Sequence, residues 1–380
     1  MNKLFQLRTC LILLGLLLLG ACQTLDTEEA LKVEEPATNV AGIESVGTGK
    51  TKIHMVLNRS GSLSSAAERS DYRDGAALAM QDLGQELITL TIINGESSLD
   101  VTESKLSTAT LDGSELIITG PDINTRTAAA NITADQQTPV IALSQSSSEY
   151  GYGFLPSSLD SLGAGMGFAL DQGKQKIAIF VPSSIAASTI EALRRRHAGR
   201  NFSLLEIPLA KDTNLRSIVN QNAASLQEAN AIIFAGTDIE VARSIRATKA
   251  LLGQSDDRLY FARYDLPSSV LSNSSLNGVL IATPDTSSNV LIADRFQSSY
   301  GRPMPFSAAY AYDIVAIASG LIRAKGENGI SKANLETDAG FRAATGAFRL
   351  RSDGRVERLF QISRLRNGKT TAVRSPPNTF

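Results

Sequence analysis

Short apolar runs alternate with longer stretches of mixed polarity along the chain from about residue 52 onward. Four early runs have the length and composition of buried strands: 52–57, 88–93, 115–119 and 139–143. Three stretches with apolar residues three or four positions apart predict amphipathic helices: 66–83, 101–111 and 125–137. Strands separated by helices of this length predict parallel pairing through βαβ units.

The same alternation begins again near residue 176. It predicts strands at 176–181, 203–207, 231–235, 258–261 and 278–282. Helices are expected among these strands at 184–195, 215–228 and 239–252. So many strands exceed the usual size of one open sheet. The pattern therefore predicts two parallel sheets, and hence two lobes.

The C-terminal part of the chain has a different character. Two helices are expected at 290–300 and 308–324. Beyond them, the apolar runs at 346–350 and 356–362 flank a turn at Asp353 and Gly354, which predicts a β-rich tail. The expected fold class is α/β, with helices flanking both sheets.

The N-terminus carries the pattern of a secretory signal. Lys3 and Arg8 precede a leucine-rich run at 11–19, and small residues follow before Cys22. The run is much shorter than the roughly 20 residues of a membrane-spanning helix. Residues 19–22 (Leu-Gly-Ala-Cys) resemble the bacterial lipoprotein box, which implies that Cys22 becomes the lipidated first residue, with palmitate among its acyl chains. An ordinary signal peptide with an incidental cysteine is the alternative.

Composition narrows the possible chemistry. The 380 residues carry a formal net charge of -1, which gives no reason to expect a nucleic-acid partner. With Cys10 in the signal and Cys22 lipidated, no cysteine remains for a disulfide or a thiol nucleophile. His54 is expected to be a hydrogen-bonded core or edge residue of the first strand, and His197 to lie on a solvated helix face. We therefore expect no enzyme, no metal site and no cofactor.

Residues 22–50 are expected to form a flexible tether behind the lipid. They include several acidic residues and few large apolar side chains, so they cannot bury enough surface to offset the entropy of ordering. Such a segment would give the folded body reach away from a membrane.

Several segments together resemble the type I periplasmic binding protein superfamily, the bilobed fold of the leucine/isoleucine/valine-binding proteins. The matching segments occur in the order expected for that family: 72–80, 118–121, 138–143, 299–303, 309–315 and 345–354. Residues 81–84 and 154–156 further resemble the penicillin-binding protein activator branch, whose members are lipoproteins. The first strand departs from that branch, because it ends in Asn58-Arg59 before Ser60-Gly61.

The resemblance implies a division of the chain into non-contiguous lobes. Residues 1–21 would be the signal peptide and 22–50 the lipidated cysteine and tether. Lobe 1 would hold 51–151 and 285–340, and lobe 2 would hold 152–284 and 341–373.

Ligands of open α/β sheets bind beyond the carboxyl ends of the strands, and the resemblance places candidate contacts there. Ser144 and Ser146 match positions that hold a ligand carboxylate, as do those of a second loop, Asn124 and Thr125. In the other lobe, the positions matching an ammonium contact are Thr237, Asp238 and Asp265. These are also ordinary turn-forming residue types, so the loops could be structural only.

Two functions follow from these expectations. The first is a non-catalytic outer-membrane lipoprotein, facing the periplasm, that activates a peptidoglycan synthase (a penicillin-binding protein). The alternative is a solute-binding lipoprotein for an amino acid or a similar small ligand, in transport or sensing. The residue after Cys22 is Gln23 rather than Asp, which by resemblance to lipoprotein sorting favours the outer membrane.

Overall fold

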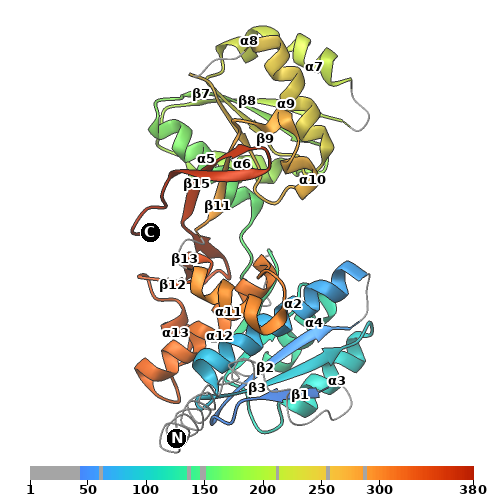
Figure 1. Cartoon of the computed structure of the whole chain (residues 1–380), viewed down its shortest axis with the longest axis vertical. Helices are drawn as coiled ribbons and strands as arrows, with labels where there is room; N and C mark the ends of the chain where they lie inside the picture. Colours follow the sequence, from blue (N-terminus) through green and yellow to red (C-terminus); the bar gives the residue numbers. More distant parts are fainter. Residues whose placement is uncertain are drawn as a thin grey trace, which may run out of the picture.

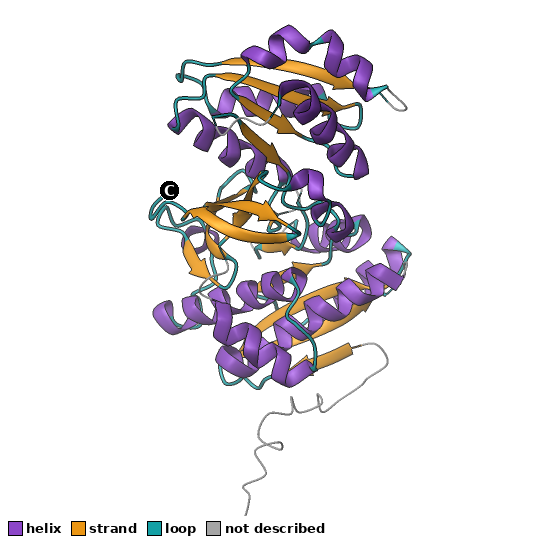
Figure 2. Cartoon of the chain, turned by 45° about the horizontal axis from the view of Figure 1, so that its top comes forward, coloured by secondary structure: helices purple, strands orange, loops and turns teal. Residues whose placement is uncertain are grey.

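Two lobes, one above the other along the long axis, make up the protein (Figure 1). The structure is a computed structural model that describes residues 43–59, 63–134, 138–145, 151–210, 214–253, 257–285 and 289–380. Each lobe has its own mainly parallel sheet, with helices on both of its faces (Figure 2). The predicted two-lobed α/β fold is therefore confirmed.

Lobe 1 is built on six strands in the order β1-β3-β2-β4-β5-β6. Their bounds are Ile43–Val46 (β1), Thr51–Asn58 (β2), Ile88–Gly95 (β3), Leu116–Thr119 (β4), Val140–Ala142 (β5) and Tyr152–Gly153 (β6). The helices α2 (Leu63–Ala79) and α12 (Phe306–Lys325) pack on one face. The other face is covered by α3 (Leu99–Ala109) and α4 (Ile123–Thr133). A π-helical turn, η2 (Met80–Gly84), ends α2.

Alternation along β2 explains how the sheet separates two cores. Ile53, Met55 and Leu57 join the core beneath α2 and α12, whereas Val56 joins the core beneath α3 and α4. His54 is 3% exposed, and its Nδ1 lies 2.9 Å from Ser114 Oγ. His54 is thus a buried, hydrogen-bonded core residue, as the sequence predicts.

β1 differs from the sequence-based expectation. Residues 43–46 fall inside the segment expected to be tether, yet they pair antiparallel with β3. Arg73 of α2 holds this strand in place, since its Nε and Nη2 donate to both carboxylate oxygens of Glu44 at 2.8 and 2.7 Å. A bidentate charged pair has a defined geometry. It therefore helps to fix the position of this short edge strand, which has few apolar side chains to pack.

Lobe 2 is built on seven strands in the order β16-β15-β11-β10-β9-β7-β8. Their bounds are Lys176–Pro182 (β7), Ser203–Leu209 (β8), Ala231–Phe234 (β9), Leu259–Ala262 (β10), Leu280–Pro284 (β11), Phe360–Arg366 (β15) and Lys369–Arg374 (β16). One face carries α5 (Ser158–Asp171) and α6 (Ala187–Arg196). The other carries α7 (Leu215–Gln221), α8 (Ala223–Glu228), α9 (Ile239–Leu252), α10 (Ser268–Leu271) and the short η3 (Ser274–Leu276).

The helix α5 is not expected from the sequence, because Gly163, Gly165 and Gly167 lower its helix propensity. The glycines are explained by packing. A Cβ on Gly165 would lie 2.9 Å from the Phe261 ring, and one on Gly163 would lie 2.8 Å from Arg196 Cδ. The glycines therefore let α5 approach the sheet and α6 closely.

The position of His197 corrects a prediction. The sequence pattern predicts a solvated face, but His197 is only 9% exposed at the end of α6, and its Nε2 lies 3.0 Å from the Gly163 carbonyl oxygen. Burial lowers the pKa of His197. The glycine surface of α5 leaves room for this ring, which the sequence pattern of α6 alone cannot show.

The tail divides between the lobes. The expected division assigns 341–373 to lobe 2, whereas β12 (Phe341–Ala343), β13 (Gly346–Leu350) and β14 (Val356–Arg358) form a separate sheet that packs on the lobe 1 core. Only β15 and β16 join lobe 2. The helices α11 (Val290–Tyr300) and α13 (Lys332–Leu335) complete the lobe 1 side.

Candidate functional site

The carboxyl ends of both main sheets face the other lobe. β6 runs parallel to β5 and leaves lobe 1 at its carboxyl end, where the chain crosses to α5. β11 runs parallel to β10 and leaves lobe 2 at its own carboxyl end, where the chain crosses back to α11. Loops that follow the parallel strands of one lobe therefore point toward those of the other, which is where ligands of such sheets bind.

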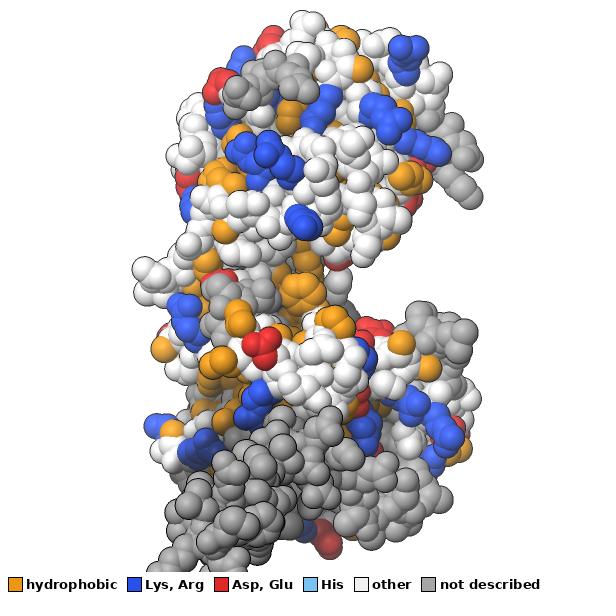
Figure 3. Space-filling view, viewed as in Figure 1, with side chains coloured by type: hydrophobic (Ala, Val, Ile, Leu, Met, Phe, Trp, Pro, Cys, Tyr) orange, Lys and Arg blue, Asp and Glu red, His pale blue; other side chains and the backbone are white. Residues whose placement is uncertain are grey.

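A recess separates these two sets of loops. In the space-filling view the molecule narrows to a waist between the lobes, with apolar side chains visible at the waist (Figure 3). The lobes stand apart on one side of the waist, so the loops on either side are open to solvent there. The recess is thus a candidate ligand cleft.

On the lobe 1 side, Ser144 follows β5 and is 6% exposed. Asn124 and Thr125 lie at the N-terminus of α4, after β4. The Asn124 amide donates to the Ser97 carbonyl oxygen at 2.6 Å. Ser146 lies outside the described residues.

Thr125 has a structural role at the start of α4. It is fully buried, its backbone N–H donates to Asp122 Oδ1 at 3.0 Å, and its hydroxyl donates to Asp122 Oδ2 at 2.8 Å. Asp122 is the N-cap of the helix. Of the two residues expected in this loop, Asn124 is therefore the one left near the surface.

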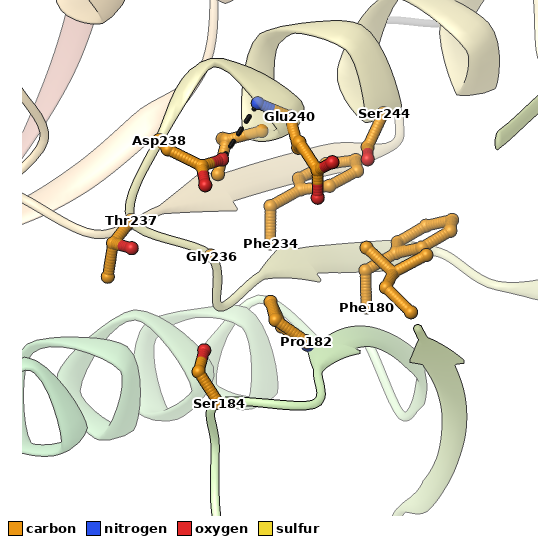
Figure 4. Close-up of a pocket in the computed structure, with 11 residues that line it drawn as sticks. Phe180, Pro182, Ser184, Phe234, Gly236, Thr237, Asp238, Glu240 and Ser244 are labelled. Atoms are coloured by element: carbon orange, nitrogen blue, oxygen red, sulfur yellow. Dashed lines mark hydrogen bonds between the residues drawn. The ribbon is translucent and has the colours of Figure 1, made fainter. Parts of the chain in front are cut away.

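On the lobe 2 side, Thr237 and Asp238 follow β9 and begin α9, and both are exposed. Asp238 Oδ1 accepts the backbone N–H of Glu240 at 2.8 Å (Figure 4). Among the described residues no cation pairs with Asp238, so its carboxylate can meet a cationic group from solvent. Ser184, which follows β7, lies beside these two residues and was missed by the sequence reasoning.

The pocket under Thr237 and Asp238 is small. Its volume of about 30 Å³ suits one or two waters rather than an organic ligand. The stacked rings of Phe180 and Phe234, 5.0 Å apart and nearly parallel, border it. This pocket is therefore too small to hold a ligand of amino-acid size by itself.

Asp265 follows β10 but is already engaged. Arg263 is 8% exposed and donates from Nε and Nη2 to the two carboxylate oxygens of Asp265 at 2.8 and 2.6 Å. Between them, Tyr264 donates its hydroxyl to the Pro156 carbonyl oxygen at 3.1 Å, on the first crossing between the lobes. The structure thus places Asp265 in an internal ion pair that leaves less of its charge for a ligand.

A buried arginine at the crossings was also missed by the sequence reasoning. The Arg358 guanidinium carbon lies 4.7, 5.0 and 4.8 Å from the ring centroids of Phe154, Tyr310 and Phe348. Its Nη2 donates to the Phe154 carbonyl oxygen at 2.8 Å, and its Nη1 to Thr345 Oγ1 at 2.9 Å. Arginine is the cation best suited to such stacking.

Asp313 completes this network inside α12. The backbone N–H groups of Ala344 and Thr345 each donate to its carboxylate at 2.8 Å, and the Thr345 hydroxyl also donates to it. Burial raises the pKa of Asp313 to about 6, although these hydrogen bonds and the nearby Arg358 favour the charged form. The network joins α12 and the tail of lobe 1 to the first crossing.

A cavity of about 560 Å³ lies where the two lobes meet beside the crossings. Its walls include Gln145 from lobe 1, α5, α6 and β14. The charges that line it are paired, since Arg196 contacts Asp160, and Glu357 accepts from Arg349 Nε. This internal pairing gives the cavity no clear preference for an ion of either sign.

In the described part of the chain, no group of three or more His, Cys, Asp or Glu side chains could hold a metal ion. Within the same residues, none of the helices has the length and apolar content needed to cross a membrane.

Comparisons with known proteins agree with the fold. The family described as periplasmic binding protein matches residues 50–370. No curated protein matches the sequence.

Among solved structures, a branched chain amino acid ABC transporter periplasmic ligand-binding protein from Burkholderia xenovorans is 17% identical with a TM-score of 0.64, covering 85% of this chain and 94% of that one. The branched-chain amino acid transporter substrate binding protein LivJ from Streptococcus pneumoniae, in complex with isoleucine, is 16% identical with a TM-score of 0.54, covering 86% and 99%. A solute binding protein from R. palustris, in complex with benzoate, is 15% identical with a TM-score of 0.56, covering 87% and 98%. At such identities the likeness shows the fold alone.

Proposed function

Because the chain belongs to the periplasmic binding protein family, we propose that it is a solute-binding protein that holds a small amino-acid-like ligand between its lobes. One observation carries the proposal most directly. Polar residues end the parallel strands of both lobes, at the two edges that face each other across an open recess. The structural relatives with an isoleucine and a benzoate ligand support the same class of small, carboxylate-bearing solute.

The charges of the two walls suit a zwitterion. On the lobe 1 wall we assign the carboxylate contact to Ser144 after β5 and Asn124 at the start of α4, because the Asp122 carboxylate already caps that helix. Asp238 offers an exposed carboxylate to an ammonium group, whereas Asp265 is neutralised by Arg263. We therefore assign the ammonium contact to Asp238 rather than to Asp265.

Anchoring belongs to the same proposal. The family points to a periplasmic location, and Cys22 would attach the body to a membrane surface through its acyl chains. With Gln23 after it, we place the anchor in the outer membrane. Docking on a penicillin-binding protein stays a prediction, and affinity capture from envelope extracts tests it.

The assignment of the walls is tested by two substitutions and a control. Ser144→Ala and Asp238→Asn should each weaken binding of an amino-acid ligand by about tenfold, as a lost hydrogen bond to a charged group would. Asparagine caps helices as well as aspartate, so Asp238→Asn should keep the unfolding temperature of the wild type. Asp257→Asn removes a carboxylate from a surface pair with Lys174 and should leave binding unchanged.

Titration calorimetry of the four proteins separates the outcomes. Unchanged affinity in Asp238→Asn would contradict the ammonium assignment. Equal loss in Asp257→Asn would mean that charge in general, rather than the recess, governs binding.

A further inference from the structure

The last strand of the chain is an open edge. β16 ends the order of the lobe 2 sheet and pairs only with β15 among the described residues. Five of its six residues are exposed, including Thr370, Thr371 and Val373. Figure 1 shows the C-terminal strands in red along the side of lobe 2 that faces the waist. An exposed edge of β-branched residues can accept a further strand.

The turn before β16 fixes this edge in place. Asn367 and Gly368 both have positive φ, 50° and 74°, as a two-residue type I′ turn requires. Asn367 N–H donates to Asn277 Oδ1 at 2.7 Å, and the Asn277 amide donates to Asn367 Oδ1 at 3.1 Å. The hairpin is thus tied to the body of lobe 2.

The pairing register leaves backbone groups free at the outer side. In a two-residue hairpin the residues flanking the turn, here Arg366 and Lys369, form a hydrogen-bonded pair. The next pair, Leu365 and Thr370, is then a non-hydrogen-bonded pair. The N–H and C=O of Thr370 therefore point away from β15, toward any strand that would be added.

The charge of this hairpin is one-sided. Residues 358–380 contain no aspartate or glutamate, and their basic residues are Arg358, Arg364, Arg366, Lys369 and Arg374. Arg374 is paired with Asp171. Within the described residues, Arg364, Arg366 and Lys369 are exposed and form no ion pair.

These three cations share one face of the hairpin. Arg364 and Arg366 are two positions apart on β15, and Lys369 lies directly opposite Arg366. Like charges opposite one another destabilise a strand pair, so the arrangement costs stability unless an anion is nearby. The same charges oppose pairing of this edge with a second copy of itself.

From the open edge and its unpaired cations, we propose that β16 is a docking edge for an extended, acidic segment of a partner protein. The partner segment adds as a strand through the outward backbone groups of β16. Its carboxylates lie over Arg364, Arg366 and Lys369. The ligand contacts that we assign to Ser144 and Asp238 lie outside this hairpin, so the two proposals can be tested independently.

The test uses the mature full chain and two fluorescent peptides of equal charge. One alternates glutamate with valine or threonine, and the other replaces every valine and threonine with proline, which cannot pair as a strand. We expect saturable anisotropy with the first peptide only, weakening several-fold from low to moderate salt. Equal binding of both peptides, or of neither, would overturn the proposal.

A matched pair of double variants locates the site. Arg364→Glu with Arg366→Glu should weaken peptide binding by about tenfold or more. Arg216→Glu with Arg246→Glu removes two exposed cations from α7 and α9, on the opposite face of lobe 2, and should leave binding unchanged. An equal loss in both pairs would show a non-specific charge effect and overturn the docking edge.

Two further arms identify the occupant. Vesicles of phosphatidylglycerol that compete fully with the peptide would identify a lipid surface instead of a protein segment. The acidic residues of the chain's own N-terminal region, Asp26, Glu28, Glu29, Glu34 and Glu35, are replaced by their amides in a second protein. Much tighter peptide binding to that protein would make the chain its own occupant, against the proposal; unchanged binding supports a partner.

Discussion

At the scale of single residues, Arg358 shows how one side chain can connect parts of this fold that are distant in sequence. It lies among three aromatic rings and donates to the carbonyl of Phe154 at the first crossing. Thr345 links it to Asp313 of α12. The nearby Asp313 offsets part of the cost of burying this charge, and Arg358 Nε is left without a hydrogen-bond partner among the described residues.

The first prediction concerns Asp313. Its pKa is raised by burial to about 6, above the 3.8 of an exposed aspartate. Stability from this group is therefore fully present below about pH 4 and is lost as the pH rises through 6. Asp313→Asn removes this contribution to the pH dependence, and the buried N–H of Ala344 or Thr345 loses an acceptor, at a cost of about 2 kcal/mol.

Urea unfolding of the wild type and Asp313→Asn at pH 4.5 and 7 checks this prediction. The free energy of unfolding of the wild type should rise relative to that of the variant as the pH falls, so the difference between the two is larger at pH 4.5 than at pH 7. A difference that shrinks at pH 4.5 would show that Asp313 has a lowered pKa instead.

At the scale of elements, the contact between α2 and α12 depends on one glycine. A Cβ on Gly75 would lie 2.0 Å from the Ala308 carbonyl oxygen, and backbone cannot move aside easily. On the same helix pair, Gly320 faces open space, since a Cβ there would meet nothing within 4 Å beyond its own helix.

The two glycines give opposite expectations for the same substitution. Gly75→Ala should destabilise the protein by on the order of 3 kcal/mol through overpacking. Gly320→Ala should stabilise it by about 0.5–1 kcal/mol, because alanine is the better helix former. Thermal unfolding of both variants decides the matter, and a stabilised Gly75→Ala would refute the close approach.

Elements also show what the sequence can and cannot predict. Strands such as β2 and β9 are predictable because their apolar runs are buried on both faces. The helix α5 is not predictable, because its glycines make room for Phe261 and Arg196, which are distant in sequence. β1 is held by the long-range pair of Glu44 with Arg73, which no local pattern reveals.

The candidate site follows the same division. The polar loops after β4, β5, β9 and β10 could be found from the chain, because each follows a strand end. The sequence could not show which of these side chains are free to contact a ligand, because that depends on their hydrogen-bond and ion-pair partners in the fold. The Thr125 hydroxyl donates to Asp122, the N-cap residue of α4, and Asp265 pairs with Arg263.

At the scale of the whole molecule, two sheets direct their carboxyl ends at each other, and the chain crosses between them at one side. The open recess gives a ligand access, and the small pocket of lobe 2 is too small to hold one alone. The binding that we propose therefore uses both lobes, with a small zwitterionic solute between them.

Titration calorimetry of the mature protein, freed of bound solute by unfolding and refolding, against a panel of amino acids and aromatic carboxylates tests this most directly. We predict saturable binding of at least one amino acid at one site per chain, lost in the combined variant Ser144→Ala with Asp238→Asn. A correctly refolded protein that binds no member of the panel, or that binds equally well in the combined variant, would contradict binding between the lobes.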